Sequence, residues 1–282
     1  MTYSRKSLIE KGILNLKKPL AFIYKDFISA ASYKFSFLSQ FVGIFITALA
    51  WFFLSSLFGG AVSAHLDRYD GDYFSFVIIG IAFANYLQVA LRSFSTNIRT
   101  AQTLGTLEAM LVTQTSIPTI IISSSLYNFI MTSFRVIVYL LIGAIAFGLN
   151  LGKANYSVAI LVLVITIVCF SSMGILSASF IMVLKKGNPL NWIFVNLSWL
   201  LGGVYYPISV LPEWLEKLSY LLPITYSLEA MRLALLNGYS FRLLLPNIIP
   251  LLIFTIIMLP LSLFIFNFAV KRAKMEGSLV QY

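Results

Sequence analysis

The segment Tyr156–Leu184, YSVAILVLVITIVCFSSMGILSASFIMVL, contains no charged residue and is long enough to cross a lipid bilayer as one helix. The whole chain has a similar character, because 59% of its 282 residues are hydrophobic and only 11% are charged. This composition is far from that of soluble domains and indicates an integral membrane protein. Six apolar runs qualify as membrane spans: Phe35–Phe58, Phe74–Leu91, Pro118–Leu151, Tyr156–Leu184, Pro189–Tyr206 and Pro246–Val270.

The distribution of basic residues predicts how these six spans are oriented. Most of the 20 Lys and Arg residues lie before the first span, after the second, after the fourth and after the sixth. The opposite loops hold more acids than bases. Because short cytoplasmic loops carry an excess of Lys and Arg, we expect a multi-pass protein of the cytoplasmic membrane with both termini in the cytoplasm. We assign the basic excess to lipid headgroups and expect no nucleic-acid partner, because the chain has no soluble basic face.

Two segments outside the spans have the pattern of interfacial helices. Residues 1–34 mix Leu, Ile and Phe with lysines at helical spacing, which predicts an amphipathic helix on the inner leaflet. An ordinary basic flank of the first span is the alternative. Residues 211–240 contain two apolar stretches broken by Pro223, each too short to cross, which predicts an external re-entrant hairpin of helices. A plain external loop packed on the spans is the alternative there.

Catalytic and metal-binding patterns are missing from the sequence. His65 is the sole histidine and Cys169 the sole cysteine, and the cysteine lies in an apolar run typical of a buried side chain. We find no phosphate-binding loop, no metal-ligand cluster and no carboxylate or histidine within the six spans. We therefore predict that the chain is not an enzyme and holds no cofactor, and that any ATP and Mg²⁺ belong to a partner subunit.

The polar stretch Arg99–Ser116, RTAQTLGTLEAMLVTQTS, interrupts two apolar runs on the predicted cytoplasmic side. Gly105 favours the end of the preceding helix, and Thr106 is a good cap for a new short helix over about 104–116. Leu107, Met110 and Leu111 then share one side of that helix. Such a helix suits either the lipid surface or a groove on a partner.

Four parts of the chain together resemble the membrane subunit of the type-2 ABC exporter family. They are the basic segment before SFLSQFVGIFITALAWFFLSSLFG, the cytoplasmic GTLEAMLVT followed by a proline, GGVYYPISVLPEWLEKLSYLLPITYSLEAMR before the last span, and the terminal EGSLVQY. The likeness covers nearly the whole chain, and its second and third parts together are the most specific.

This resemblance implies an all-α membrane fold in which the helix at the GTLE position couples to a separate ATPase. Gly105, Thr106, Leu107 and Glu108 would make that contact, with Glu108 facing basic or amide groups of the partner. The resemblance also implies an external gate at Tyr205, Tyr206 and Pro207. Two permease chains, either two copies or one copy with a sister permease, would work with two ATPase subunits.

A substrate path between the two permease chains would run along the second and fifth spans. Candidate lining residues, each of which could instead pack in the core or against lipid, are Phe76, Phe83, Tyr86, Asn196, Trp199 and Tyr205. The expected function is outward transport of a lipid, drug-like molecule or glycan by alternating access. A membrane scaffold, or a subunit of a lipid-modifying complex without transport of its own, is the alternative.

Overall fold

The computed structural model describes residues 20–21, 23–24, 27–28, 34–62, 65–69, 72–103, 117–184 and 189–275. Within these residues the chain is helical, with short connections and no strand. The predicted coupling helix, about 104–116, and most of the predicted interfacial helix, 1–34, lie outside the described residues.

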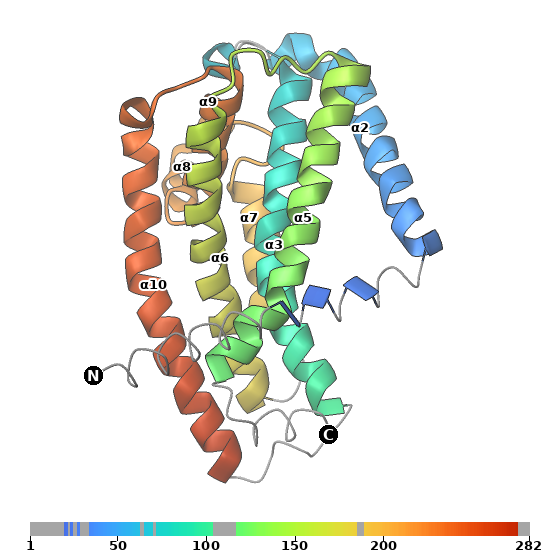
Figure 1. Ribbon diagram of the computed structural model, residues 1–282. Helices are drawn as coiled ribbons and strands as arrows, with labels where there is room; N and C mark the ends of the chain where they lie inside the picture. Colours follow the sequence, from blue (N-terminus) through green and yellow to red (C-terminus); the bar gives the residue numbers. More distant parts are fainter. Residues whose placement is uncertain are drawn as a thin grey trace, which may run out of the picture.

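Five long helices form the bundle shown in Figure 1. They are α2 (Lys34–Val62), α3 (Tyr73–Thr103), α5 (Ile117–Phe147), α6 (Tyr156–Leu184) and α10 (Phe241–Met275). Each contains a described stretch that is long and apolar enough to cross a membrane. We call the end at which α3 ends and α5 begins the proximal end, and the end at which α3 and α6 begin the distal end (Figure 1).

Helix α3 forms the centre of the bundle. It packs against α5, α6 and α9 and also touches α2 and α7, and 83% of its apolar window is buried inside the protein. Asp72 caps its first turn, where the carboxylate accepts hydrogen bonds from the backbone amides of Phe74 (3.2 Å) and Ser75 (2.9 Å). The helix therefore starts at a fixed point and runs without a break to Thr103, beyond the predicted end of the second span at Leu91.

Helices α2 and α10 lie at the periphery of the bundle. Only 11% of the apolar window of α2 and 22% of that of α10 is buried within the chain. Their outward faces carry large apolar side chains, including Phe45, Phe53, Ile256 and Phe264. Exposed apolar surface on this scale is typical of lipid contact or of an interface with another membrane chain. Three prolines, at 246, 250 and 260, are accommodated inside α10.

The predicted fifth span, Pro189–Tyr206, differs from what the structure contains. Helix α7 (Pro189–Leu201) has 13 residues, or about 20 Å at 1.5 Å per residue, and is too short to cross a bilayer of roughly 30 Å alone. It ends at the pair Gly202–Gly203, where Gly203 has a φ of 75°. That left-handed conformation favours glycine and stops the helix five residues before the predicted boundary.

The segment after α7 completes the passage from the proximal to the distal end. A 3₁₀ turn η3 (Ile208–Val210) leads to α8 (Glu213–Ser219) and α9 (Pro223–Leu236), which match the two apolar stretches of the predicted hairpin. Helix α9 is buried along most of its length against α3, α6 and α10. Because α6 ends proximally and α10 begins distally, α7, α8 and α9 together take the chain across the bundle (Figure 1).

Candidate functional site

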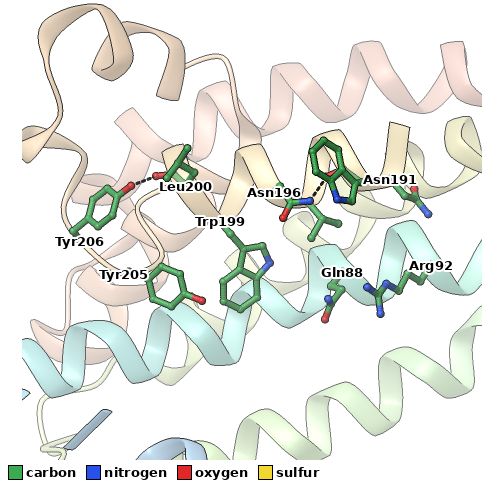
Figure 2. A pocket seen from close by; sticks show the side chains of 10 residues that line it. Gln88, Arg92, Asn191, Asn196, Trp199, Leu200, Tyr205 and Tyr206 are labelled. Carbon is green, nitrogen blue, oxygen red and sulfur yellow. Dashed lines mark hydrogen bonds between the residues drawn. The ribbon is translucent and has the colours of Figure 1, made fainter. Parts of the chain in front are cut away.

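An open groove of about 850 Å³ lies between α3 and α7. Figure 2 shows Gln88 and Arg92 on α3, Asn191 and Asn196 on α7, and Trp199 and Tyr205 further along toward the distal end. The complete lining is Gln88, Arg92, Asn191, Trp192, Val195, Asn196, Trp199, Leu200, Tyr205 and Tyr206. We call this space the proximal groove.

Aromatic rings close the distal end of the proximal groove. Tyr205 stacks on Trp51 of α2 with ring centroids 5.0 Å apart, and it also lies 5.4 Å from the ring centroid of Trp199. The Tyr206 hydroxyl donates a hydrogen bond to the carbonyl of Leu200 (Figure 2). These contacts tie the turn after α7 to both α2 and α7, so the rings form an ordered wall.

The polar side chains of the proximal groove fall into two groups. The Asn191 amide donates to the Leu91 carbonyl (2.9 Å) and to Ser95 Oγ (3.3 Å), and therefore fastens α7 to α3. The Asn196 amide donates to the Trp192 carbonyl in its own helix (2.7 Å). By contrast, Gln88 and Arg92 make no hydrogen bond or ion pair within the described part of the chain. Their donors remain available to a ligand.

A second cavity, of about 650 Å³, lies toward the distal end, and we call it the distal cavity. Most of its lining is polar or aromatic. It comprises His65, Asp67, Arg68, Tyr69, Phe76, Gly202, Gly203, Pro207, Ile208, Ser209, Glu216, Tyr220, Thr225, Tyr226, Glu229, Arg232, Pro246 and Asn247.

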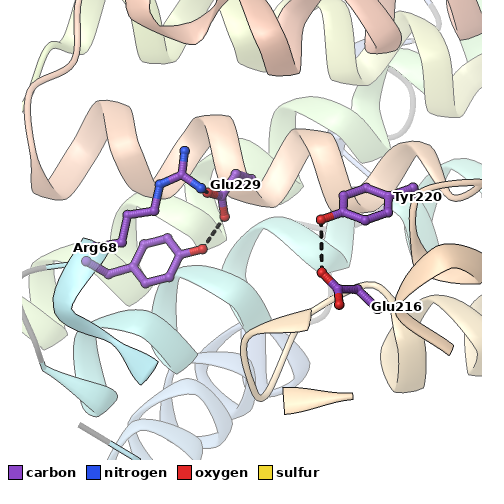
Figure 3. Close-up of polar contacts among 5 residues, drawn as sticks. Arg68, Glu216, Tyr220 and Glu229 are labelled. Carbon is purple, nitrogen blue, oxygen red and sulfur yellow. Dashed lines mark hydrogen bonds and ion pairs between the residues drawn. The ribbon is translucent and has the colours of Figure 1, made fainter. Parts of the chain in front are cut away.

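Two acidic side chains of the distal cavity, Glu216 and Glu229, are held by local partners (Figure 3). Arg68 forms an ion pair with Glu229 (Nη1 to Oε1, 3.0 Å), and the Tyr69 hydroxyl donates a hydrogen bond to the same carboxylate. The Tyr220 hydroxyl donates to Glu216 Oε1 at 3.2 Å. Burial, followed by the charge of Glu229, raises the pKa of Tyr69 above its usual value of 10, so the phenol keeps its proton and remains a donor.

The turn 202–207 is the wall that separates the two spaces. Tyr205 and Tyr206 line the proximal groove, whereas Gly203 and Pro207 line the distal cavity. A residue of α9, Arg232, anchors this turn: its guanidinium donates to the carbonyls of Gly203 (2.8 Å) and Val204 (3.0 Å).

Arg232 also fastens the turn to α3. Its Nε donates to the Phe76 carbonyl at 3.0 Å, and its guanidinium carbon lies 3.4 Å from the Phe76 ring centroid. Gly80 makes this contact possible, because a Cβ there would lie 2.3 Å from both Arg232 Nη2 and the Val204 carbonyl oxygen. Only 2% of Arg232 is exposed, so this cation is held by backbone oxygens and one aromatic face.

The predicted site residues separate into three groups in the structure. Tyr205, Tyr206, Asn196 and Trp199 line the proximal groove, and Pro207 and Phe76 line the distal cavity. Phe83 and Tyr86 are buried inside the bundle, where Tyr86 donates a hydrogen bond to Ser133, and they line neither space. The predicted coupling residues Gly105, Thr106, Leu107, Glu108, Met110 and Leu111 lie outside the described residues.

Sequence reasoning missed the role of Arg232. Its charge suggests an external loop, yet the residue is buried in α9. One signal was present in the sequence: Arg232 interrupts the otherwise apolar stretch MRLALL, where an unpaired charge would be costly. Arg135, in the third predicted span, also has a partner, because its Nε donates to Gln40 Oε1 of α2 at 2.9 Å. Cys169 is buried, as its apolar surroundings predict.

No group of three or more His, Cys, Asp or Glu side chains that could hold a metal occurs among the described residues. The groups available to bind a ligand are instead the aromatic rings of the proximal groove together with Gln88 and Arg92, which have no partner among the residues that the structure describes. The distal cavity adds tyrosines and carboxylates. This combination suits binding and release of an organic molecule.

Comparison with protein families gives one assignment. The family model described as ABC-2 type transporter matches residues 20–236, which is more than half of the chain. No curated protein matched the chain in a sequence search. The matched region includes α3, the proximal groove and all of α9. The resemblance inferred from the sequence motifs is thereby confirmed, and the chain belongs to the ABC-2 type transporter family as a membrane permease component.

Proposed function

We propose that two copies of this permease chain, together with two copies of a separate ABC ATPase subunit, move an amphipathic substrate outward across the cytoplasmic membrane by alternating access. The observation that best supports this proposal is that the proximal groove and the distal cavity lie on either side of one wall. The proximal groove and the distal cavity share the turn 202–207, which supplies side chains to both. Displacement of this single turn would join the two spaces.

The charges of the bundle support one orientation in the membrane. Arg92, Arg99, Lys271 and Arg272 lie toward the proximal end, where the described residues include no acid. At or near the distal end the described acids are balanced by an equal number of bases: Asp67, Asp72, Glu213, Glu216 and Glu229 against Arg68, Lys153, Lys217, Arg232 and Arg242. By the positive-inside rule, this excess of basic residues supports a cytoplasmic position for the proximal end. Substrate would enter the proximal groove from the inner side of the membrane and leave through the distal cavity.

Helix α3 supports a mechanical link between the ATPase and the wall. It is continuous over 31 residues, about 46 Å, from the distal cavity to the residue that precedes the predicted coupling segment 104–116. Phe76 and Gly80, at its distal end, contact Arg232, which anchors the turn 202–207. A displacement of the proximal end of α3 on nucleotide binding would therefore reach the wall through a packed helix.

The second copy completes the route. The proximal groove is open on one side, and exposed apolar residues such as Trp192, Ile193 and Leu200 of α7 surround it. A second permease chain facing α3 and α7 would enclose the groove between two walls. The apolar faces of α2 and α10 would contact membrane lipids.

Thiol accessibility tests alternating access directly. Cys169 is the sole cysteine, so its replacement by Ala gives a background for single reporters. In membranes containing the permease and its ATPase, Asn196→Cys should react with an external, membrane-impermeant thiol reagent only after hydrolysis of ATP and trapping of the resulting ADP with vanadate. Ser209→Cys, in the distal cavity, should react with and without trapped nucleotide and is the matched control. An Asn196→Cys reaction rate unaffected by nucleotide would contradict the proposal.

A further inference from the structure

The proximal groove has a charge pattern that selects among substrates. Among the described residues that line it, Arg92 is the only charged one, and none carries a carboxylate. Arg92 has no ion pair within the described residues, and the adjacent Gln88 amide has no hydrogen-bond partner there. A cation and an amide one helical turn apart on α3 thus face the groove together. Such a pair is complementary to a phosphate or carboxylate group.

The rest of the proximal groove is suited to an apolar body. From Asn191 to Leu200 the groove follows α7 for about 14 Å, with Val195, Leu200 and the indole rings of Trp192 and Trp199 along its wall. Tyr205 closes the far end, where its ring stacks on Trp51 and makes a tilted contact with Trp199. The groove therefore has a polar, cationic end and an apolar, aromatic body, which is the pattern of an amphipath.

The distal cavity has the opposite charge. Its cations are already engaged, since Arg68 pairs with Glu229 and Arg232 is bound to three backbone carbonyls. Neutral carbonyls do not cancel the charge of Arg232, so the three carboxylates of Asp67, Glu216 and Glu229 and the two guanidinium groups leave this lining with one net negative charge. An anionic group attracted to Arg92 would be repelled from this second space. The two spaces together therefore favour binding at the proximal end and release at the distal end.

We propose that the proximal groove binds an amphipath with an anionic head, a phosphate or a carboxylate, contacting Arg92 and Gln88, and an apolar body along Trp192 and Trp199. This inference rests on the proposed transport function, because it gives the substrate class of the same groove. Amphipaths with a cationic head would be poor ligands of the groove.

Quenching of the two groove indoles, Trp192 and Trp199, by lipids with brominated chains measures this selectivity. The full-length chain, with Trp51 and Trp214 replaced by Phe, is placed in phosphatidylcholine nanodiscs. Brominated phosphatidic acid, brominated phosphatidylcholine and a brominated trimethylammonium lipid are then added separately. Because a charge-assisted contact is stronger than a neutral one, phosphatidic acid should bind next to these indoles at least about tenfold more tightly than either other lipid.

Variants assign the preference to Arg92. Arg92→Gln should reduce the preference for phosphatidic acid to near unity, and Arg92→Lys should retain most of it because the positive charge remains. Lys271→Gln removes one charge from the proximal end of α10 and should leave the preference unchanged, so it controls for general attraction to the inner surface. Equal quenching by the three lipids, or equal effects of Arg92→Gln and Lys271→Gln, would overturn the proposal.

Two further measurements distinguish an amphipath site from a site for a free anion, and a failure of binding from a failure of transport. Inorganic phosphate should not reverse quenching by phosphatidic acid, because it cannot use the aromatic wall; full displacement would indicate a site for the free anion and overturn the assignment to an amphipath. Binding is measured without ATP, so its failure is distinct from a failure of transport. A nucleotide-independent Asn196→Cys reaction with intact lipid selectivity would contradict the proposed function alone.

Discussion

Arg232 is the residue that holds the wall between the two spaces. Its five N–H donors suit several carbonyls at once, and three bonds go to Phe76, Gly203 and Val204. A lysine would keep the charge but would offer a compact ammonium in place of the planar fork. The geometry of the guanidinium, as well as its charge, is therefore needed at this position.

Replacing Arg232 by Lys should destabilise the protein and loosen the turn 202–207. We expect loss of at least one charge-assisted hydrogen bond, at about 1.5–3 kcal/mol each, and a lower midpoint of thermal unfolding in detergent. In membranes, Asn196→Cys should then react with the external thiol reagent even without trapped nucleotide. Arg242→Lys, at an exposed position near the start of α10, is the control and should change neither measurement.

The close packing around Gly80 leads to a separate prediction. A Cβ at position 80 would lie 2.3 Å from Arg232 Nη2 and from the Val204 oxygen, so Gly80→Ala must displace Arg232, the turn or both. Overpacking of this kind costs about 1–3 kcal/mol, and we expect the unfolding midpoint to fall by several degrees. Gly43→Ala in α2 meets no atom within 4 Å and should leave the midpoint equal or higher. Equal midpoints for the two variants would contradict this packing.

At the scale of elements, α3 is proposed to act as a rigid connection, and proline tests its rigidity. Thr96→Pro, at an exposed position, removes a helical hydrogen bond to the carbonyl of Arg92 and introduces a kink. We expect the ATPase to remain bound while substrate-stimulated ATP hydrolysis falls at least about tenfold. A proline in a helix interior costs about 3 kcal/mol, which is enough to uncouple movement of the proximal end of α3 from movement of its distal end. Thr96→Ala keeps the helix and should retain stimulation.

The contrast between α6 and α7 explains how far local sequence predicts these elements. The predicted span Tyr156–Leu184 coincides with α6, because an uninterrupted apolar run between polar connections defines both ends. The predicted span Pro189–Tyr206 exceeds α7, because hydropathy continues through Gly202 and Gly203 while backbone conformation ends the helix. An apolar run shows which residues can contact lipid, but it does not show where a glycine in a left-handed conformation ends the helix.

Residue type and position in the sequence predicted part of the candidate site. Asn196, Trp199, Tyr205 and Tyr206 line one groove, as their polar and aromatic character within an apolar run suggested. Phe83 and Tyr86 have the same character but face the core, because helix rotation is set by packing among α3, α5 and α6. Arg232 depends on contacts with residues 156 and 28 to 29 positions away, which no local pattern contains.

At the scale of the whole molecule, the proposed function takes its energy from a separate ABC ATPase subunit, with which ABC-2 membrane components typically work. The contact with that chain is predicted at 104–116, directly after the last residue of α3. Because α3 packs against every other long helix except α10, force applied there would be distributed to the bundle as a unit. Docking at this one segment would therefore govern the coupling of hydrolysis to movement of the wall.

Glu108→Arg tests that docking in the assembled transporter. Reversing the charge of the only acid in the segment Arg99–Ser116 should place a positive charge against basic groups of the ATPase groove and remove the acceptor for its amide donors. We expect loss of substrate-stimulated ATP hydrolysis and at least about tenfold weaker co-purification, because truncating or reversing one partner of a buried charge contact costs about 2–5 kcal/mol. Insertion of the chain into the membrane should be unchanged, since Glu108 lies outside every apolar run.

Glu213→Arg, at the distal end, reverses an equal charge on the opposite side and should leave hydrolysis intact. Unchanged turnover in Glu108→Arg would show that the ATPase engages the permease elsewhere.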